Sequence, residues 1–193
     1  MGWKAETEKD EFMKIAVDPG ANGSISCKTD GKVHAFKMPD TPKDILLLIM
    51  SLKTDDAFCW IEQVGKYMPG NSGVAAVTFA RHCGHLDMAL LAAGIPHDTV
   101  LPAKWEHWLI GKPNYPKIVF PDVPIDIPKR DQRLMLTKQE KERTRILAKR
   151  KQERKNKIKA KVQGLYPDIR VTLALADSLG ILVWGLAQEG GVT

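Results

Sequence analysis

Three acidic residues interrupt segments that are otherwise apolar. Asp18 ends the run IAVD, Glu62 lies within CWIEQV, and Asp177 lies within LALADSLGIL. Burial of a lone carboxylate is costly unless the group is paired or holds a metal ion, and no Lys or Arg stands inside these runs. The pattern therefore predicts one shared cation site, in which oxygen-only ligands favour Mg²⁺, or Mn²⁺ in its place, over zinc.

Each of these acids also has a local alternative. Asp18 opens an Asp-Pro-Gly sequence, which is a common turn in which an Asp hydrogen-bonds nearby. Glu62 lies among bulky apolar neighbours, where a local role is harder to assign. Asp177 follows four apolar residues, which does not suit a helix N-cap. We therefore predict that all three residues are metal ligands.

A second chemical feature is the basic segment at residues 129–161. It holds 15 Lys and Arg against 4 Asp and Glu, whereas the rest of the chain holds 14 against 19. Such a segment attracts nucleic-acid phosphates through charge without reading base sequence. The residues expected to contact DNA in this way are Lys149, Arg150, Lys151, Arg154 and Lys157.

Cysteine chemistry and membrane insertion are not expected. The three cysteines are widely spaced and form no CxxC, which argues against a disulfide framework or a cysteine-based zinc site. His82, Cys83 and His85 stand close together, but helix packing explains them better than a metal does. No apolar run approaches roughly 20 residues, and the acidic N-terminus does not suit a signal peptide. We expect an intracellular, cytoplasmic protein without a membrane partner.

The elements that must position these side chains follow from periodicity and turn signals. Short apolar or alternating runs predict strands at 14–18, 24–28, 32–38, 56–64 and 97–102, with an Asp-Gly hairpin turn at 30–31. Helices are predicted at 41–53, 74–94, 103–109, 132–165 and 173–187, the first capped by Thr41 and the second ended by Gly94. This order predicts an α/β fold with a mixed sheet.

In order and context, these motifs resemble those of RuvC-type Holliday junction resolvases. VDPGANGSI at 17–25 is similar to the first motif of that family, and IEQV at 61–64, followed by Asn71 and Ser72, is similar to the second. KNKIKAKV at 155–162 resembles its basic helix, and ALADSLGIL at 174–182 resembles its closing motif. The matching pieces span about residues 13–187.

The resemblance implies an RNase H-like fold, in which helices flank a mixed five-stranded sheet. It also implies a homodimer that uses two Mg²⁺ ions to make paired cuts in four-way or branched DNA, leaving 5′-phosphate ends. By position, Asp18, Glu62 and Asp177 become the metal ligands, Lys155 a catalytic contact to the scissile phosphate, and Lys104 a further DNA contact.

The sequence departs from the family pattern at three places. Ala174 replaces a fourth acid or His, so the second ion is expected only with DNA bound; Asp168 and Asp87 are the candidates for a substitute. Gly65 replaces an aromatic wedge, and Tyr67 is the nearest aromatic that could stack at a junction. Residues 111–153, Pro-rich and then Lys/Arg-rich, resemble a basic helical insertion within a single domain at 13–187. The combination suggests a divergent member, such as a phage or viral branch acting in the host cytoplasm.

Other functions remain open at this point. A nuclease of the same fold could act on DNA flaps or RNA-containing substrates. A non-catalytic nucleic-acid-binding module would need only the Lys/Arg-rich helix. An actin-like ATPase also carries Asp-x-Gly after a strand, but that fold needs two such domains, which 193 residues cannot hold.

Overall fold

The computed structural model describes residues 12–65 and 72–190. One sheet is formed by β1 (Lys14–Asp18), β2 (Ser24–Thr29), β3 (Lys32–Lys37), β4 (Phe58–Glu62) and β5 (His97–Val100). The strand order is β3-β2-β1-β4-β5; β1, β2 and β3 pair antiparallel, while β1, β4 and β5 are parallel. The mixed five-stranded sheet expected from the sequence is confirmed.

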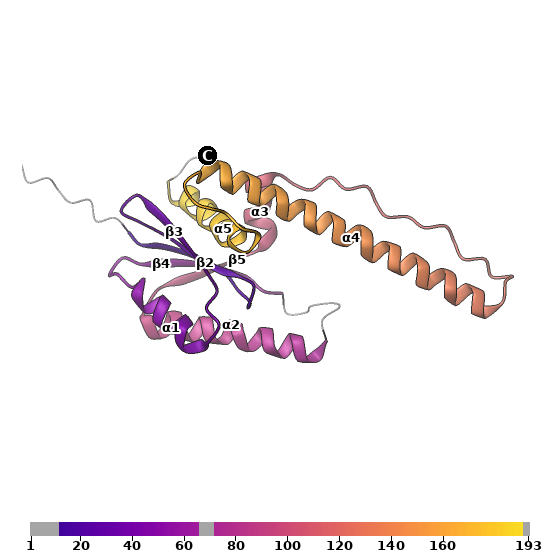
Figure 1. Ribbon diagram of the computed structural model, residues 1–193, viewed down its shortest axis with the longest axis horizontal. Helices are drawn as coiled ribbons and strands as arrows, with labels where there is room; N and C mark the ends of the chain where they lie inside the picture. The colour runs from indigo at the N-terminus through magenta and orange to yellow at the C-terminus, as the bar shows by residue number, and fades with distance from the viewer. Residues whose placement is uncertain (1–11, 66–71, 191–193) are drawn as a thin grey trace, which may run out of the picture.

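Helices cover both faces of this sheet. The helices α1 (Pro42–Ser51) and α2 (Gly73–Ala93) lie on one face, as Figure 1 shows. On the other face lies α5 (Leu173–Glu189), with α3 (Pro102–Ile110) and α4 (Lys129–Leu165) packed against it. The predicted boundary signals are present, since Thr41 accepts a hydrogen bond from the Asp44 amide, and Gly94 ends α2 at a φ of 63°.

Alternation along the strands decides which side chains face α5. Successive residues of a strand point to opposite faces of the sheet. Ile15 belongs to the core shared with α1 and α2, whereas Ala16 and Trp60 belong to the core beneath α5. Asp18 and Glu62 stand two residues beyond Ala16 and Trp60, so both are directed toward the face that α5 covers.

Small residues let α5 lie close to its neighbours. A Cβ atom on Gly180 would lie 2.7 Å from Cζ3 of Trp105, and this Trp side chain is fully buried. The Ser24 hydroxyl donates to the Ser178 hydroxyl at 2.6 Å, and Ser24 is the cross-strand partner of Asp18. This packing fixes the rotation of α5 and directs the residue before Ser178 toward the end of β1.

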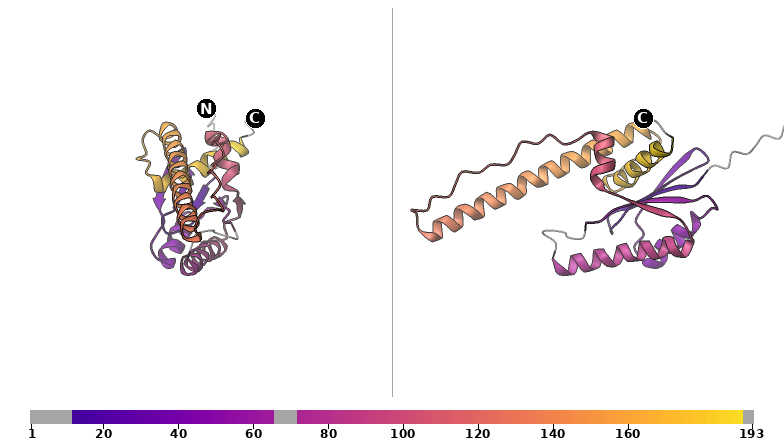
Figure 2. Two further views of the ribbon diagram at one scale, coloured as in Figure 1. Left: turned by 90° about the vertical axis from the view of Figure 1, so that its right-hand side faces the viewer. Right: turned by 180° about the vertical axis from the view of Figure 1, so that it is seen from behind.

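The long helix α4 belongs only partly to the body of the molecule. Its buried residues are Ile158 and Val162, and its N-terminal half projects beyond the sheet (Figures 1 and 2). The extended segment 111–128 runs beside this half, and we call residues 111–150 the arm. The helix passes residue 153 without a break. Across the described ranges, no helix combines the length and apolar character needed to cross a membrane.

Candidate active site

The three acids predicted from the sequence meet at one end of the sheet. Val17 of β1 pairs with Ile61 of the parallel strand β4, so Asp18 and Glu62 follow at the same edge. Asp177 comes from the second turn of α5. All three side chains are half-buried, and we call them the carboxylate cluster.

Burial and mutual repulsion both act on this cluster. Burial raises the pKa of Asp18 to about 7, and the charge of Asp177 adds to the rise. Burial raises the pKa of Glu62 to about 8, with further contributions from Asp18 and Asp177. The pKa of Asp177 is also raised, chiefly by burial. Each negative group disfavours ionisation of the others. A bound positive charge would relieve this repulsion, so a site of this kind favours the binding of a cation.

The α4 helix brings positive charge to the cluster. Lys155 Nζ lies 3.6 Å from Oδ2 of Asp177 and opposes the rise in the pKa of that carboxyl. The charge of Arg154 opposes the rise at both Glu62 and Asp177. Lys151, one turn earlier, acts on Asp177 as well. One face of α4 therefore supplies cations that the acidic runs themselves lack.

Sequence reasoning missed a fourth acid, Glu106 of α3. Its side chain is 9% exposed and accepts a 2.7 Å charged hydrogen bond from Nη1 of Arg154. Burial raises the pKa of Glu106, Arg154 opposes the rise, and Asp177 adds to it. The sequence carries one signal for this residue, a charged group between the tryptophans of WEHWL.

The two substitute ligands considered for the position of Ala174 lie elsewhere. Asp168 is exposed in the turn between α4 and α5. Asp87 is exposed on α2, where its charge raises the pKa of Cys83 after the larger effect of burial. Glu106, in contrast, raises the pKa of a member of the cluster, Glu62.

The donor chemistry fits a hard divalent cation, since carboxylate oxygens are the preferred ligands of Mg²⁺ and Mn²⁺. The arrangement is not a closed cage. Among the described residues, no three His, Cys, Asp or Glu side chains stand in a geometry that would hold an ion. The cluster is instead balanced by Lys155 and Arg154, so a metal ion would have to compete with these internal cations.

The turn after Asp18 is held by α2. Gly20 has a φ of 116°, which favours glycine, and its amide donates to Nδ1 of His82 at 3.2 Å. Burial lowers the pKa of His82, which keeps Nδ1 available as an acceptor. A Cβ atom on Gly23 would collide with the carbonyl oxygen of Asp18. His82 thus supports the loop that carries the first acid.

The remaining residues predicted to contact DNA lie around the cluster or on the arm. Lys104 Nζ lies 5.2 Å from the ring centre of Trp184, on the α5 side. Arg150 stacks on Tyr115, 4.9 Å from its ring centre. Three lysines are exposed along α4, namely Lys149, Lys151 and Lys157. Tyr67 lies outside the described residues, so its stacking role stays a prediction.

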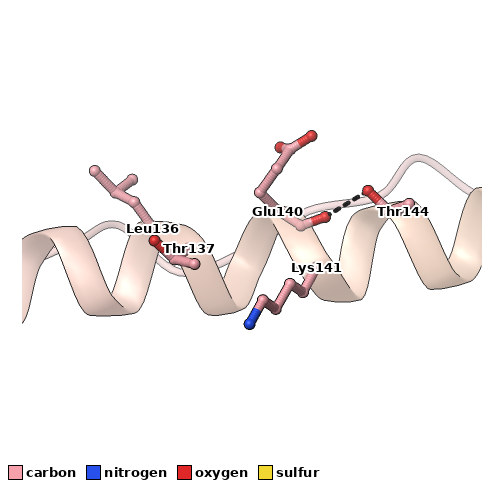
Figure 3. Close-up of a pocket in the computed structure, with 5 residues that line it drawn as sticks. All are labelled: Leu136, Thr137, Glu140, Lys141 and Thr144. Atoms are coloured by element: carbon pink, nitrogen blue, oxygen red, sulfur yellow. Dashed lines mark hydrogen bonds between the residues drawn. The ribbon is translucent and has the colours of Figure 1, made fainter. Parts of the chain in front are cut away.

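A hollow of about 520 Å³ lies on the arm, away from the cluster. Figure 3 shows that its lining comes from one stretch of α4, where the Thr144 hydroxyl donates to the Glu140 carbonyl at 2.9 Å. The lining residues are Leu136, Thr137, Glu140, Lys141 and Thr144. A hollow walled by a single helix gathers no catalytic groups, so the candidate chemistry remains at the cluster.

Comparison with known proteins identifies the fold. No family model and no curated protein matches the sequence. Among solved structures, a Thermus thermophilus RuvC structure matches with a TM-score of 0.51 and 13% identity, covering 93% of this chain and 97% of that one. A T. thermophilus RuvC in complex with a Holliday junction substrate matches with a TM-score of 0.53 and 12% identity, covering 93% and 96%. The chain therefore has a RuvC-like RNase H fold.

Proposed function

We propose that this chain is a metal-dependent endodeoxyribonuclease that resolves four-way or other branched DNA junctions, leaving 5′-phosphate ends. The observation that carries the proposal is the meeting of Asp18, Glu62 and Asp177 beside Lys155 on a RuvC-like fold. One of the structures sharing this fold is RuvC bound to a Holliday junction. The transfer of that substrate class to this chain is part of the proposal.

In this proposal, Asp18, Glu62 and Asp177 hold Mg²⁺ or Mn²⁺, with two ions present once DNA is bound. An ion held by these carboxylates would supply Lewis-acid chemistry, which would activate a water and offset negative charge on the leaving oxygen. Lys155 then exchanges its contact with Asp177 for the scissile phosphate, where its charge offsets the negative charge that develops. The apolar core beneath α5 forms the floor of the site.

The arm and a second copy of the chain complete the proposal. Exposed Lys and Arg along α4 neutralise the DNA backbone without selecting sequence. A homodimer would offer two cluster sites to two of the four strands of a four-way junction, because a two-fold axis relates both the sites and the two strands that are cut. Sedimentation of the protein alone and with a junction measures this stoichiometry.

The proposed function is tested with three labelled substrates: a four-way junction, a flapped duplex and an RNA–DNA hybrid. Wild type and Asp18→Asn are compared with Mg²⁺ and with a chelator. We expect Mg²⁺-dependent cuts in the junction by the wild type alone. Preference for the flap or the hybrid would favour the alternative nucleases. Binding without any cut would favour a nucleic-acid-binding module, for which Ala174 and the open arrangement of the cluster are the supporting features.

A further inference from the structure

Glu106 and Arg154 form an ion pair between two elements beside the carboxylate cluster. Their N–O distance is 2.7 Å, and the residues are 48 positions apart in the chain. Glu106 stands on a firmly packed helix, because the adjacent Trp105 is fully buried and Leu109 is also in the core. The carboxylate therefore has a fixed position, to which the longer and more mobile Arg side chain is tied.

The ion pair uses only part of the Arg154 guanidinium. Nη1 donates to Glu106, whereas the buried Nε–H has no hydrogen-bond partner within the described part of the chain. Buried donors are rarely left unpaired. Guanidinium groups characteristically bind phosphate through two donors at once. This donor is buried although the side chain as a whole is 35% exposed, so it would meet a phosphate oxygen of a ligand as the guanidinium turns toward that ligand.

The placement of Arg154 also matters for the acids it does not touch. Its charge acts on Glu62 and Asp177, yet among the described residues its ion pair within 4.0 Å is with Glu106. Without Glu106, the nearest strong attraction for the guanidinium would be the cluster itself. A guanidinium that moved onto the cluster would block the ligands that a cation needs.

We propose that Glu106 is a positioning residue that holds Arg154 beside the carboxylate cluster, and that Arg154 contacts the substrate phosphate bound there. This inference rests on the proposed nuclease function and deepens it. It assigns Arg154 to the reacting phosphate, together with Lys155, and removes it from the general backbone contacts predicted for the basic segment at 129–161. Glu106 acts through Arg154 and keeps the guanidinium from occupying the place of the metal.

The test is a double-mutant cycle on the intact protein. Single-turnover cleavage of a four-way junction is measured for Glu106→Gln, Arg154→Gln and the double variant, at saturating protein and Mg²⁺. We expect Glu106→Gln to slow cleavage by roughly 10- to 100-fold, as a misplaced catalytic group does. The double variant should be no slower than Arg154→Gln, because the carboxylate acts only through that side chain.

Two conservative variants and one control keep the test specific. Glu106→Asp and Arg154→Lys retain the charges but not the geometry, and we expect both to lose rate with little change in thermal stability. The control is Glu189→Gln, which removes the carboxylate of a 2.6 Å ion pair with Lys14 at the opposite end of β1. This control should cut at the wild-type rate. If Glu106→Gln fails to fold, the conservative pair carries the test.

A second readout does not depend on cleavage. The Arg154 Nε–H proton, followed by its ¹⁵N NMR signal, should be protected from solvent exchange in the wild type and lose that protection in Glu106→Gln. The signal should also shift when a junction is added with Ca²⁺ in place of Mg²⁺. The inference would be overturned if the effects of the two single variants on the logarithm of the rate add fully in the double variant and the Mg²⁺ requirement rises. Glu106 would then be a metal ligand in its own right. An unchanged rate in Glu106→Gln or an unshifted Arg154 signal would also overturn the inference. If the wild type cuts no substrate, the proposed function fails, and the NMR shift still decides whether Arg154 meets DNA.

Discussion

The two halves of α4 carry the same residue types in opposite environments. Near the sheet, Lys155 is 34% exposed and Arg154 35% exposed, and both face carboxylates that are at most 16% exposed. On the arm, Arg145 is 83% exposed and lies 3.7 Å from Glu142. An exposed pair of this kind contributes about 0–1 kcal/mol, whereas charges beside buried acids interact strongly. Burial of their partners, and not residue type, makes Lys and Arg part of the site.

The largest expected effect comes from the inner region. Asp18→Asn and Glu62→Gln should each slow junction cleavage by roughly 100-fold or more. Each variant removes the negative charge of a carboxylate that we propose binds the metal ion. Junction affinity should stay within about threefold, since the phosphate contacts elsewhere remain. Single-turnover kinetics and a gel-shift titration measure the two quantities.

The matched control for these variants is an acid outside the cluster. Asp168→Asn removes an exposed carboxylate in the turn that leads into α5, and its cleavage rate should equal that of the wild type. If Asp18→Asn cuts at the wild-type rate, the carboxylate cluster is not the catalytic site. The inner part of α4 would then have no catalytic role that distinguishes it from the arm.

The next effect concerns stability without metal. The pKa of Asp18 is raised from 3.8 to about 7 and that of Glu62 from 4.5 to about 8. Between those values the folded protein keeps protons that the unfolded chain has released, so the free energy of unfolding should fall as pH rises. We expect a loss of several kcal/mol between about pH 5 and about pH 8, at about 1.4 kcal/mol for each pH unit over which one of the two carboxyls keeps its proton.

Urea unfolding in a chelator at several pH values measures this loss. Asp18→Asn should remove part of the pH dependence, and Mg²⁺ should restore stability near the upper end of the window by binding the ionised form. Stability that rises with pH across the window would show that the acids are not buried against one another.

A smaller effect is expected from the outer region. Changing Lys141, Arg145 and Lys149 to Gln removes exposed charge from the arm. Affinity should fall about 10-fold for junction and duplex alike, and each lost phosphate contact should flatten the log–log salt dependence by roughly 0.9. Fluorescence anisotropy at several salt concentrations measures the slope. An unchanged slope would mean that the arm does not touch DNA.

The smallest effect concerns the contact that ties the extended segment to α4. The Tyr115 hydroxyl donates to the carbonyl of Arg150 at 3.2 Å, and its ring lies under the guanidinium. Tyr115→Ala should cost about 1 kcal/mol locally, raising hydrogen exchange across 111–128 with little change in the melting temperature. Tyr115→Phe keeps the ring and separates the stacking from the hydrogen bond. Unaltered exchange in Tyr115→Ala would place the attachment of this segment elsewhere, for instance at Gln139, which donates to the Pro121 carbonyl.

The sequence by itself determined the elements and three of the acids. Alternation and turn chemistry are local properties, so β1 was predicted with its observed bounds, Asp30 and Gly31 form the hairpin turn at positive φ, and Thr41 caps α1. Asp18, Glu62 and Asp177 were identifiable because a carboxylate in an apolar run is costly wherever the run folds.

Only the tertiary structure decided which groups meet those acids. Basic side chains lie all around α4, and its apolar residues are too sparse to indicate a buried face; the packing of Ile158 and Val162 selects that face. Contact between Glu106 and Arg154, or between Gly20 and His82, joins elements far apart in the chain. Such contacts depend on how helices dock on the sheet, and no periodicity within a single element encodes that docking.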